Sequence, residues 1–491
     1  MFTDQKMVLR GYFSGIQHSI HIGSDIWSDS FQKHSYMGVT AHWIDEAWQL
    51  QKRILAYKSF DDRHTASNIY QMIRGVLEDY GILTKVFSIG FDNASSNTAS
   101  IPDLEKACNP HFGSKYFHIR CVCHVFNLCV QAGINALSSS IDPFRDVVNY
   151  LWRHPRVMRE WSSYCESNGK TPKRFSKDVS TRWNSTYLLL QQINEYKEIL
   201  IRFLYENQDI NIIIDYRLWH VLEKIVECLE PFNSATNNLS GVYYPTAHLF
   251  MGECVNIAEV FKKVGDVDVG PAVFQMREKW LSYFTEIPMI FLVAFALDPR
   301  CKLNYLSHFL QEYYTSLDLE ADVDLIVKKV QIELETMCKE ISNARGGTGK
   351  SINVQDNVST PRRLERMSKS SKMMMQKQKG KSKEEPTEVD TYLHKFDYTD
   401  YFGEMTDFNI LAWWENYSQP LPNISLIAKQ ILATPCSNVA VEQAFSKGGL
   451  VLSDKRSSLV PNSVEAQICL GDWVSAAYRN EVEEVDLTQD N

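Results

Sequence analysis

The sequence predicts a mixed fold, in which a small α/β domain is interrupted by a large all-α insertion and followed by a further helical region. In roughly the first quarter of the chain, short runs of alternating apolar and polar residues predict strands. From about Asp142 to Ser342, apolar residues instead recur at the spacing of one helix face, as at Val147, Val148 and Leu151. With 491 residues, the chain is long enough for two or three such units.

The N-terminal part begins with Met1 to Gln17, which shows no clear periodicity. The stretch HSIHIGSDIW then alternates apolar residues at Ile20 and Ile22 and predicts a strand that ends on Asp25. Two more strand patterns follow, YMGVTAHWID and LQKRILAYKSF, and then a helix over Thr65 to Tyr80 with one apolar face. Three strands followed by a helix is the order of an RNase H-like domain.

A fourth strand pattern, KVFSIGFDNASSN, ends on Asp92, and Asn93 and Asn97 mark the turn beyond it. A short helix over Asp103 to Cys108 leads to a fifth strand, FHIRC, and to a helix over HVFNLCVQAGINAL. Asp25 and Asp92 are therefore both placed at strand ends. Taken singly, each aspartate is more simply a turn or cap residue.

Near the C-terminus, the stretch from Thr434 to Leu459 predicts a helix with a carboxylate in its middle, Glu442. Its buried face is formed by Val439, Ala440, Ala444 and Phe445. The pair Gly448-Gly449 is the expected stop signal, followed by a short extended piece, Leu450 to Leu452, and a second helix. Taken alone, Glu442 is most simply a solvated helix residue.

Composition and charge limit the classes of function. The hydrophobic content of 44% is that of ordinary soluble globular proteins. No apolar run approaches the about 20 residues of a membrane helix, and the N-terminus is not a signal peptide, so we expect the cytosol or nucleus and no membrane partner. The net charge of -9 argues against coating DNA by bulk electrostatics, so any nucleic-acid contact must use local basic surface.

The eleven cysteines are an odd number scattered through the chain and are interpreted as mostly buried, reduced thiols. Cys121, Cys123 and His124 suggest zinc, but a structural zinc site needs four ligands and no convincing second pair follows. Cys108, His111 and His118 carry little weight as additional ligands. No structural zinc is expected.

From Gly346 to Pro386 the composition changes to a polar and then basic segment. Its basic residues include Arg362, Arg363, Arg366, Lys369, Lys372, Lys377, Lys379, Lys381 and Lys383. This composition predicts a disordered basic linker, assigned to residues 343–386. The run could act in nuclear import or as a nonspecific DNA tether, although most such runs are simply solvated.

The C-terminal stretch resembles the signature of hAT-superfamily transposases and of their domesticated plant relatives of the RICESLEEPER and DAYSLEEPER kind. The matching residues are Pro435, Glu442, Phe445, Ser446, Gly448, Gly449, Arg456, Ser457 and Leu459. SDIWSDS and FDNASSN resemble the elements that carry the first two family acids, and YYPTAHLF and LVAFALDPRCK resemble scaffold elements. The resemblance extends from Asp25 to Trp473.

This resemblance implies that Asp25, Asp92 and Glu442 form a catalytic and metal-binding triad for Mg²⁺ or Mn²⁺, with two ions clamping a phosphodiester. It also implies DNA contacts. His124 resembles a residue at a helix start beside the acids, and Arg182 and Trp183 resemble a pair that grips flanking DNA and stacks on an extruded base. A core position for Trp183, with Ser180 or Thr181 as a helix cap, is equally compatible with the sequence.

We therefore expect five regions: the first part of an RNase H-like domain (18–141), an all-helical insertion (142–342), the basic linker (343–386), a hAT C-terminal dimerisation region that returns the catalytic-type helix (387–478), and an acidic tail (479–491). Trp413, Trp414, Leu426 and Ile431 predict self-association, as a homodimer or higher homo-oligomer, because they offer more apolar surface than one short region can hide.

Two departures from the family pattern bear on activity. No zinc-finger pattern of the BED type precedes Asp25 in this sequence, and Gln443 stands where many active members have arginine. The first hypothesis is a domesticated, nuclear, dimerising protein that contacts DNA weakly or nonspecifically and does not transpose. The alternative is an active DD(E)-type two-metal transposase or nuclease. A generic helical scaffold is disfavoured because it does not explain the acids.

Overall fold

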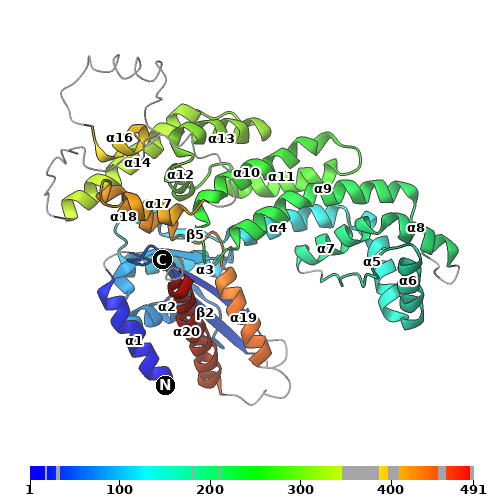
Figure 1. The fold of residues 1–491 in the computed structure, drawn as a ribbon, viewed down its shortest axis with the longest axis horizontal. Helices are drawn as coiled ribbons and strands as arrows, with labels where there is room; N and C mark the ends of the chain where they lie inside the picture. Colours follow the sequence, from blue (N-terminus) through cyan, green and yellow to red (C-terminus); the bar gives the residue numbers. More distant parts are fainter. Residues whose placement is uncertain are drawn as a thin grey trace.

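The computed structural model describes residues 1–16, 19–28, 34–179, 182–207, 210, 212–345, 386–395, 408–451 and 460–486. Nearly all of the predicted basic linker lies outside these residues, as do Ser180, Thr181 and the signature residues Arg456, Ser457 and Leu459. The predicted architecture of a small mixed sheet, a large helical insertion and C-terminal helices is confirmed (Figure 1).

One sheet contains all five predicted strands, in the order β3-β2-β1-β4-β5. The strands are β1 (Ile20–Ser28), β2 (Ser35–Ile44), β3 (Leu50–Ser59), β4 (Val86–Phe91) and β5 (His118–Arg120). The first three form an antiparallel meander, whereas β4 runs parallel to both β1 and β5. The parallel pairing brings the C-terminal ends of β1 and β4 to the same end of the sheet.

Helices cover both faces of the sheet. On one side lie α1 (Phe2–Gly15), α2 (Ala66–Tyr80) and α3 (Ser95–Cys108). The ring of Phe13 from α1 is fully buried, 5.1 Å from Trp43 and 6.0 Å from Tyr80 between ring centroids. The lead-in without periodicity is therefore a helix. Its sequence shows no apolar face because Phe13 is its only buried residue.

The opposite face is covered by α19 (Val439–Val451), which contacts β1, β2 and β3. The predicted helix stop at Gly448-Gly449 is wrong, because α19 continues through both glycines to Val451. Gly448 instead lies against the ring of Tyr57, where a Cβ would overlap the Tyr57 hydroxyl. The glycine allows close approach to the sheet rather than ending the helix. Of the predicted extended piece, Leu450 and Val451 are helical and Leu452 lies outside the described residues.

The long C-terminal helix α20 (Pro461–Asp486) lies along β3, the edge strand. Asp472 accepts a hydrogen bond from the Ile54 backbone N–H at 2.8 Å, and the Trp473 indole N–H donates to the Ile54 carbonyl at 2.9 Å. Asp472 also forms an ion pair with Lys52, and the two side chains are only 5% and 3% exposed. Asp472 and Trp473 thus hydrogen-bond to the backbone N–H and carbonyl of Ile54, which an uncovered edge strand would leave unpaired. The helix continues into the segment predicted as an acidic tail.

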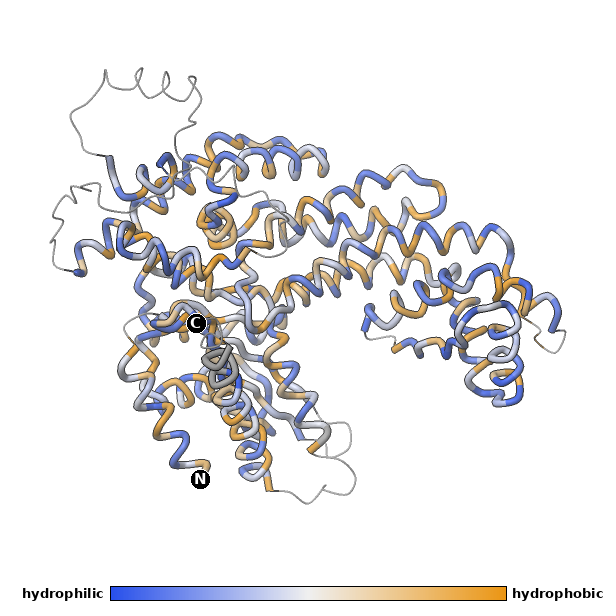
Figure 2. The backbone as a smooth tube through the Cα atoms, in the orientation of Figure 1, coloured by the Kyte–Doolittle hydropathy of each residue, from blue (hydrophilic) through white to orange (hydrophobic). Residues whose placement is uncertain are grey.

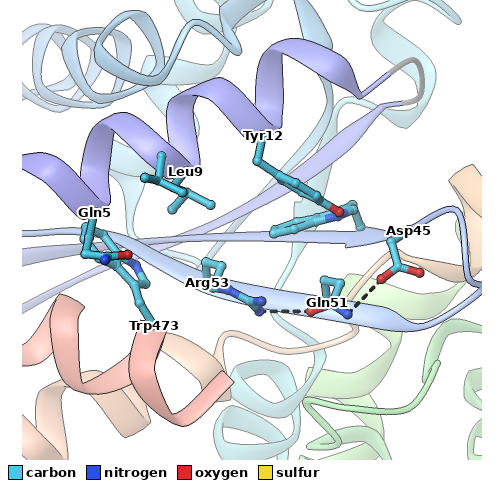
Figure 3. A pocket seen from close by; sticks show the side chains of 9 residues that line it. Gln5, Leu9, Tyr12, Asp45, Gln51, Arg53 and Trp473 are labelled. Atoms are coloured by element: carbon cyan, nitrogen blue, oxygen red, sulfur yellow. Dashed lines mark hydrogen bonds between the residues drawn. The ribbon is translucent and has the colours of Figure 1, made fainter. Parts of the chain in front are cut away.

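Helices α1 and α20 also flank a cavity of about 310 Å³ over β2 and β3 (Figure 3). Tyr12, Trp43 and Trp473 contribute aromatic walls. At its polar end, Arg53 donates to Gln51 Oε1 at 3.0 Å, and Gln51 donates to Asp45 Oδ2 at 2.9 Å. This network fixes the end of the β2–β3 hairpin that faces the helical part of the chain.

The remaining helices build a second core and an extended arm (Figure 1). They are α4 (Val122–Ala136), α5 (Ser138–Arg153), α6 (Pro155–Ser167), α7 (Trp183–Glu195), α8 (Lys197–Glu206), α9 (Tyr216–Leu239), α10 (Phe250–Phe261), α11 (Gly270–Phe284), α12 (Met289–Ala296), α13 (Lys302–Ser316), α14 (Val323–Ala344), α16 (Glu388–Lys395), α17 (Ile410–Tyr417) and α18 (Pro422–Leu432). Among the described residues, no single helix is long and apolar enough to cross a membrane, although α11 and α12 together, bent by 84°, pass the same criteria.

Three of the four apolar residues that motivated self-association are hidden inside the chain, and the fourth, Leu426, is partly buried. Trp414 is fully buried, and its indole N–H donates to the Leu297 carbonyl at 3.1 Å. Trp413 stacks on Tyr417 with ring centroids 4.4 Å apart and is 6% exposed, and Ile431 is fully buried. The reason given for self-association was therefore wrong. The insertion covers this surface, most visibly through α12, which is apolar along its length (Figure 2).

Candidate carboxylate and nucleic-acid site

Asp25 lies near the end of β1, and Asp92 directly follows β4, the neighbouring parallel strand. Gly23 of β1 pairs with Gly90 of β4, and each aspartate follows its glycine by two residues. Asp25 Oδ1 accepts the Ile26 N–H at 2.8 Å, and Asp92 Oδ1 accepts the Ala94 N–H at 3.0 Å as part of the turn after β4. The strand ends predicted from the sequence thus bring the two carboxylates to one place.

Glu442 approaches from α19, which is positioned by the residue just before it, Asn438. The Asn438 side chain donates to the Ser24 carbonyl of β1 at 3.1 Å, and its backbone N–H donates to Cys121 Sγ at 3.3 Å. Room for Asn438 comes from Gly90, where a Cβ would lie 3.0 Å from Asn438 Oδ1. Asn438 therefore fixes the start of α19, and with it the height of Glu442 above the sheet.

A cavity of about 770 Å³ opens between the sheet, α4, α7, α9 and α19. Its lining includes most of the predicted site residues: Asp25, His124, Arg182, Trp183 and Glu442. Asp92 does not line this cavity but lies beside Asp25. The structure thus places the three acids and the three predicted DNA contacts around one region, although they come from widely separated parts of the sequence.

The environment of Asp25 favours its protonated form. Burial raises its pKa to about 7, with further upward contributions from the negative charges of Asp92 and Glu442, and the Ile26 N–H offsets part of the shift. Burial also raises the pKa of Glu442, while Arg182 and His124 act in the opposite direction. The acids therefore repel each other, and their nearest cations lie on the Glu442 side of the cavity.

Carboxylate oxygens are the donors that Mg²⁺ and Mn²⁺ prefer, and mutually repelling carboxylates gain from a cation between them. The donor set therefore fits such an ion chemically. Within the described residues, however, no group of three His, Cys, Asp or Glu side chains is close enough to hold one ion. Asp25 and Asp92 form an adjacent pair, and Glu442 faces them as a separate third acid.

Three family models match parts of the chain. Residues 23–112 match the ZBED1 RNase-like domain, residues 119–228 the ZBED1 RNase-like helical domain, and residues 388–474 the hAT family C-terminal dimerisation region. The chain is thus similar to ZBED1 in its N-terminal and helical parts and to the hAT family in its C-terminal region.

Three relatives illustrate the extent of the hAT similarity. "Putative AC transposase" of Zea mays is 29% identical over 98% of this chain and 60% of its own length. The zinc finger BED domain-containing protein RICESLEEPER 3 of Oryza sativa subsp. japonica is 24% identical over 96% of this chain and 63% of its own length. DAYSLEEPER of Arabidopsis thaliana is 23% identical over 96% of this chain and 66% of its own length. The chain thus spans about 60% of the length of its maize relative.

Two side chains with expected hAT-like DNA contacts have different surroundings. Arg182 is exposed at the N-terminus of α7. Trp183 is 4% exposed and belongs to the helical core, with its ring centroid 6.4 Å from that of Tyr187, yet it also lines the cavity. The structure therefore combines the two alternatives that the sequence left open: the indole is packed and reaches the cavity wall only at its margin.

Sequence reasoning missed the residues that position the three acids. Asn438 lies within the predicted C-terminal stretch, and Gly23 and Gly90 lie within predicted strands, but no local pattern assigns them a further role. Their roles depend on contacts between β1, β4 and the start of α19, which no local pattern contains. One signal was available, because small residues two positions before both strand-end aspartates indicate that another segment packs closely there.

Proposed function

We propose that this hAT transposase-derived chain is a nuclear, DNA-associated protein that self-associates and does not carry out transposition. The observation that carries the proposal is the single cavity that holds Arg182, His124 and the margin of Trp183 beside Asp25 and Glu442. A guanidinium at a cavity mouth attracts a phosphate backbone, and an indole edge offers apolar contact to a base. A nuclear location follows from DNA as the partner.

Self-association is supported by the match of residues 388–474 to the hAT dimerisation region. The buried tryptophans do not contribute, so the contact must use other surface of this region. Sedimentation of the purified chain at micromolar concentration is expected to show a dimer or larger oligomer. A monomer under these conditions would remove self-association from the proposal without affecting DNA binding.

A second candidate, a metal-dependent transposase or nuclease, is favoured by the adjacency of Asp25 and Asp92 below Glu442. These three residues would hold the divalent cations, which supply charge stabilisation to a phosphodiester. The Asp25 carboxyl would release its proton as a cation binds, and Arg182 would orient the phosphate. Against this candidate stands Gln443, since many active hAT proteins have a cation directly after the third acid.

The deciding experiment incubates the chain with Mn²⁺ and duplexes that carry the terminal repeats of related elements. We expect salt-sensitive binding and no nicking above the level of an E442Q variant. Nicking at the element end that E442Q and D25N both abolish would overturn the proposed loss of activity and establish the second candidate. Absence of DNA binding by the unaltered chain at low salt would overturn both.

A further inference from the structure

The segment between α6 and α7, residues 170–178 and here called the strap, has no regular secondary structure and belongs to no sheet. Side chains of the surrounding helices hold its backbone instead. Its carbonyls accept from the Tyr196 hydroxyl at Thr171 (2.8 Å), the Trp161 indole at Lys173 (2.8 Å) and the Trp152 indole at Phe175 (2.9 Å), while the Ser176 N–H donates to Gln192 at 2.7 Å. Phe175 is fully buried beneath it. The strap is therefore held in one conformation.

The strap and its surroundings are rich in basic side chains, of which Arg174 and Lys177 are exposed and Lys173 is partly exposed. From Arg145 to Arg182 the sequence has nine Lys and Arg residues (145, 153, 156, 159, 170, 173, 174, 177 and 182) against four Asp and Glu residues (146, 160, 166 and 178), although the whole chain has a net charge of -9. Among the residues that the structure describes, Lys173, Arg174 and Lys177 form no ion pair. The strap's own acid, Asp178, is already paired with Arg145 at 2.5 Å.

Two of these cations share one aromatic ring. The Arg174 guanidinium carbon lies 3.4 Å and the Lys177 ammonium 4.4 Å from the ring centroid of Trp152. The indole N–H is already bound to the Phe175 carbonyl, so the ring cannot turn away freely. Two like charges held near one ring without a paired acid repel each other, and an anion close to both would relieve that repulsion. The pair therefore forms a pre-organised anion-binding surface.

The strap leads directly to the carboxylate cavity. The hydroxyls of Ser185 and Thr186 on α7 donate to Asp178 at 2.9 and 2.7 Å, which fixes the end of the strap to the helix that begins beside Arg182. Lys173, Arg174 and Lys177 are spread over five consecutive residues, so their charges suit several phosphates of a duplex backbone rather than a single phosphate group.

We infer that the strap binds the phosphate backbone of duplex DNA that approaches the cavity, and that it does so without recognising the base sequence. This inference rests on the proposed function for the identity of the anion. Lys173, Arg174 and Lys177 supply the charge, and the aromatic donors of Trp152, Trp161 and Tyr196 supply the rigidity. Contacts to phosphates alone position DNA but carry no base information.

The test measures binding of the full chain to a duplex of arbitrary sequence over a range of KCl concentrations, in EDTA so that cleavage plays no part. The variant K173A/R174A/K177A is compared with K328A/K329A/K339A, which removes three exposed lysines from α14. Each lost phosphate contact lowers the salt dependence by about 0.9 in log K per log salt. We expect the strap variant to lose about 2 to 3 in slope and 10- to 100-fold in affinity at low salt, with the α14 variant unchanged.

A charge-preserving variant, K173R/R174K/K177R, separates charge from folding, and it is expected to retain the slope of the unaltered chain. Equal losses in the strap and α14 variants, or an unchanged slope in the strap variant, would overturn the inference while leaving the proposed DNA association intact. No binding by the unaltered chain would overturn the proposed function itself. Failure of the Mn²⁺ nicking experiment has no effect on this result.

Discussion

Two aspartates, one on α20 and one beneath α19, have opposite surroundings. Asp472 of α20 is buried beside Lys52 and accepts a backbone N–H from the edge strand. Asp25, beneath α19, is crowded by Asp92 and Glu442, and its pKa is raised to about 7. One carboxylate therefore has a buried cation and a backbone N–H as partners, whereas the other is crowded by further acids. The difference separates a residue that holds the molecule together from one that is available for a cation or a proton.

The helices themselves also dock by different means. Helix α19 fits by shape: glycines on the sheet and on the helix leave room for Val441 and Phe445, and a Cβ at Gly38 would lie 2.6 Å from Val441 Cγ1. Helix α20 instead supplies hydrogen-bonding groups to β3. We therefore expect the packing of α19 to be disturbed by an added methyl group. The docking of α20 should instead be disturbed by the loss of a hydrogen-bonding or charged partner.

The largest loss in the free energy of unfolding is expected when the contact between Asp472 of α20 and β3 is removed. D472A leaves the Lys52 ammonium buried without its acid and the Ile54 N–H without its acceptor. Breaking a buried ion pair by removing one partner costs about 3 to 5 kcal/mol. Denaturant unfolding measures this loss, and D103N on the exposed side of α3 is the control, with a change within about 0.5 kcal/mol. A D472A chain as stable as D103N would show that α20 does not secure the edge.

At the shape contact, G448A should cost about 2 kcal/mol, because the added methyl overlaps Tyr57. The Tyr57 ring is packed against Tyr36 and Phe445, with centroids 5.0 and 5.8 Å away, so it cannot move aside cheaply. Thermal unfolding with a matched denaturant series gives the value. A stabilised G448A chain would mean that α19 does not lie this close to β3.

The next largest change in stability is expected for the D25N variant at high pH. Unlike D472A, this variant should be more stable than the unaltered chain. Because the pKa of Asp25 is raised from its ordinary value of 3.8 to about 7 in the folded chain, stability is lost as pH rises from about 4 to 7 and stays constant above. D25N should therefore be equal to the unaltered chain near pH 4 and more stable at pH 8, by about 1 to 2 kcal/mol after allowance for solvent screening.

Unfolding curves at the two pH values provide the measurement. Millimolar Mg²⁺ should stabilise the unaltered chain at pH 8 more than D25N, because a bound cation removes the same repulsion. A stability difference that is the same at both pH values would contradict the crowded environment of Asp25, whatever the response to Mg²⁺.

The smallest change in stability is expected for a substitution at Gly449, the residue after Gly448. Nothing lies within 4 Å of a Cβ at Gly449. Replacing a glycine inside a helix by alanine gains about 0.5 to 1 kcal/mol. G449A should therefore be slightly more stable than the unaltered chain in the same unfolding assay, and a loss like that of G448A would show that the two glycines are not distinguished by the sheet.

Local patterns allowed most elements of the sheet to be predicted from the sequence. Alternation located the strands that end at Asp25 and Asp92, and helical spacing located Glu442, because these signals lie within a few residues of each side chain. That the three acids belong together came from the hAT resemblance, and their catalytic role stays a prediction.

What was missed depends on contacts between distant segments. The glycine at 448 has the sequence appearance of a helix stop, and only the position of Tyr57 shows that it serves close packing. Trp413 and Trp414 suggested a free apolar surface because the helices that cover them lie far away in sequence. Asn438 and Asp472 are ordinary polar residues until β1 and β3 are placed beside them.

The capping of β3 by α20 also has a consequence for synthesis. Lys52 and Asp472 are separated by 420 residues. At about 5 to 20 residues per second, the ribosome needs roughly 20 to 80 s to deliver α20 after β3 has emerged. During that interval the nascent chain presents an unpaired strand to its neighbours on the polysome, a template for aggregation. Slow translation should therefore lower the soluble yield, and a chain cut before Asp472 should be recovered mainly as aggregate.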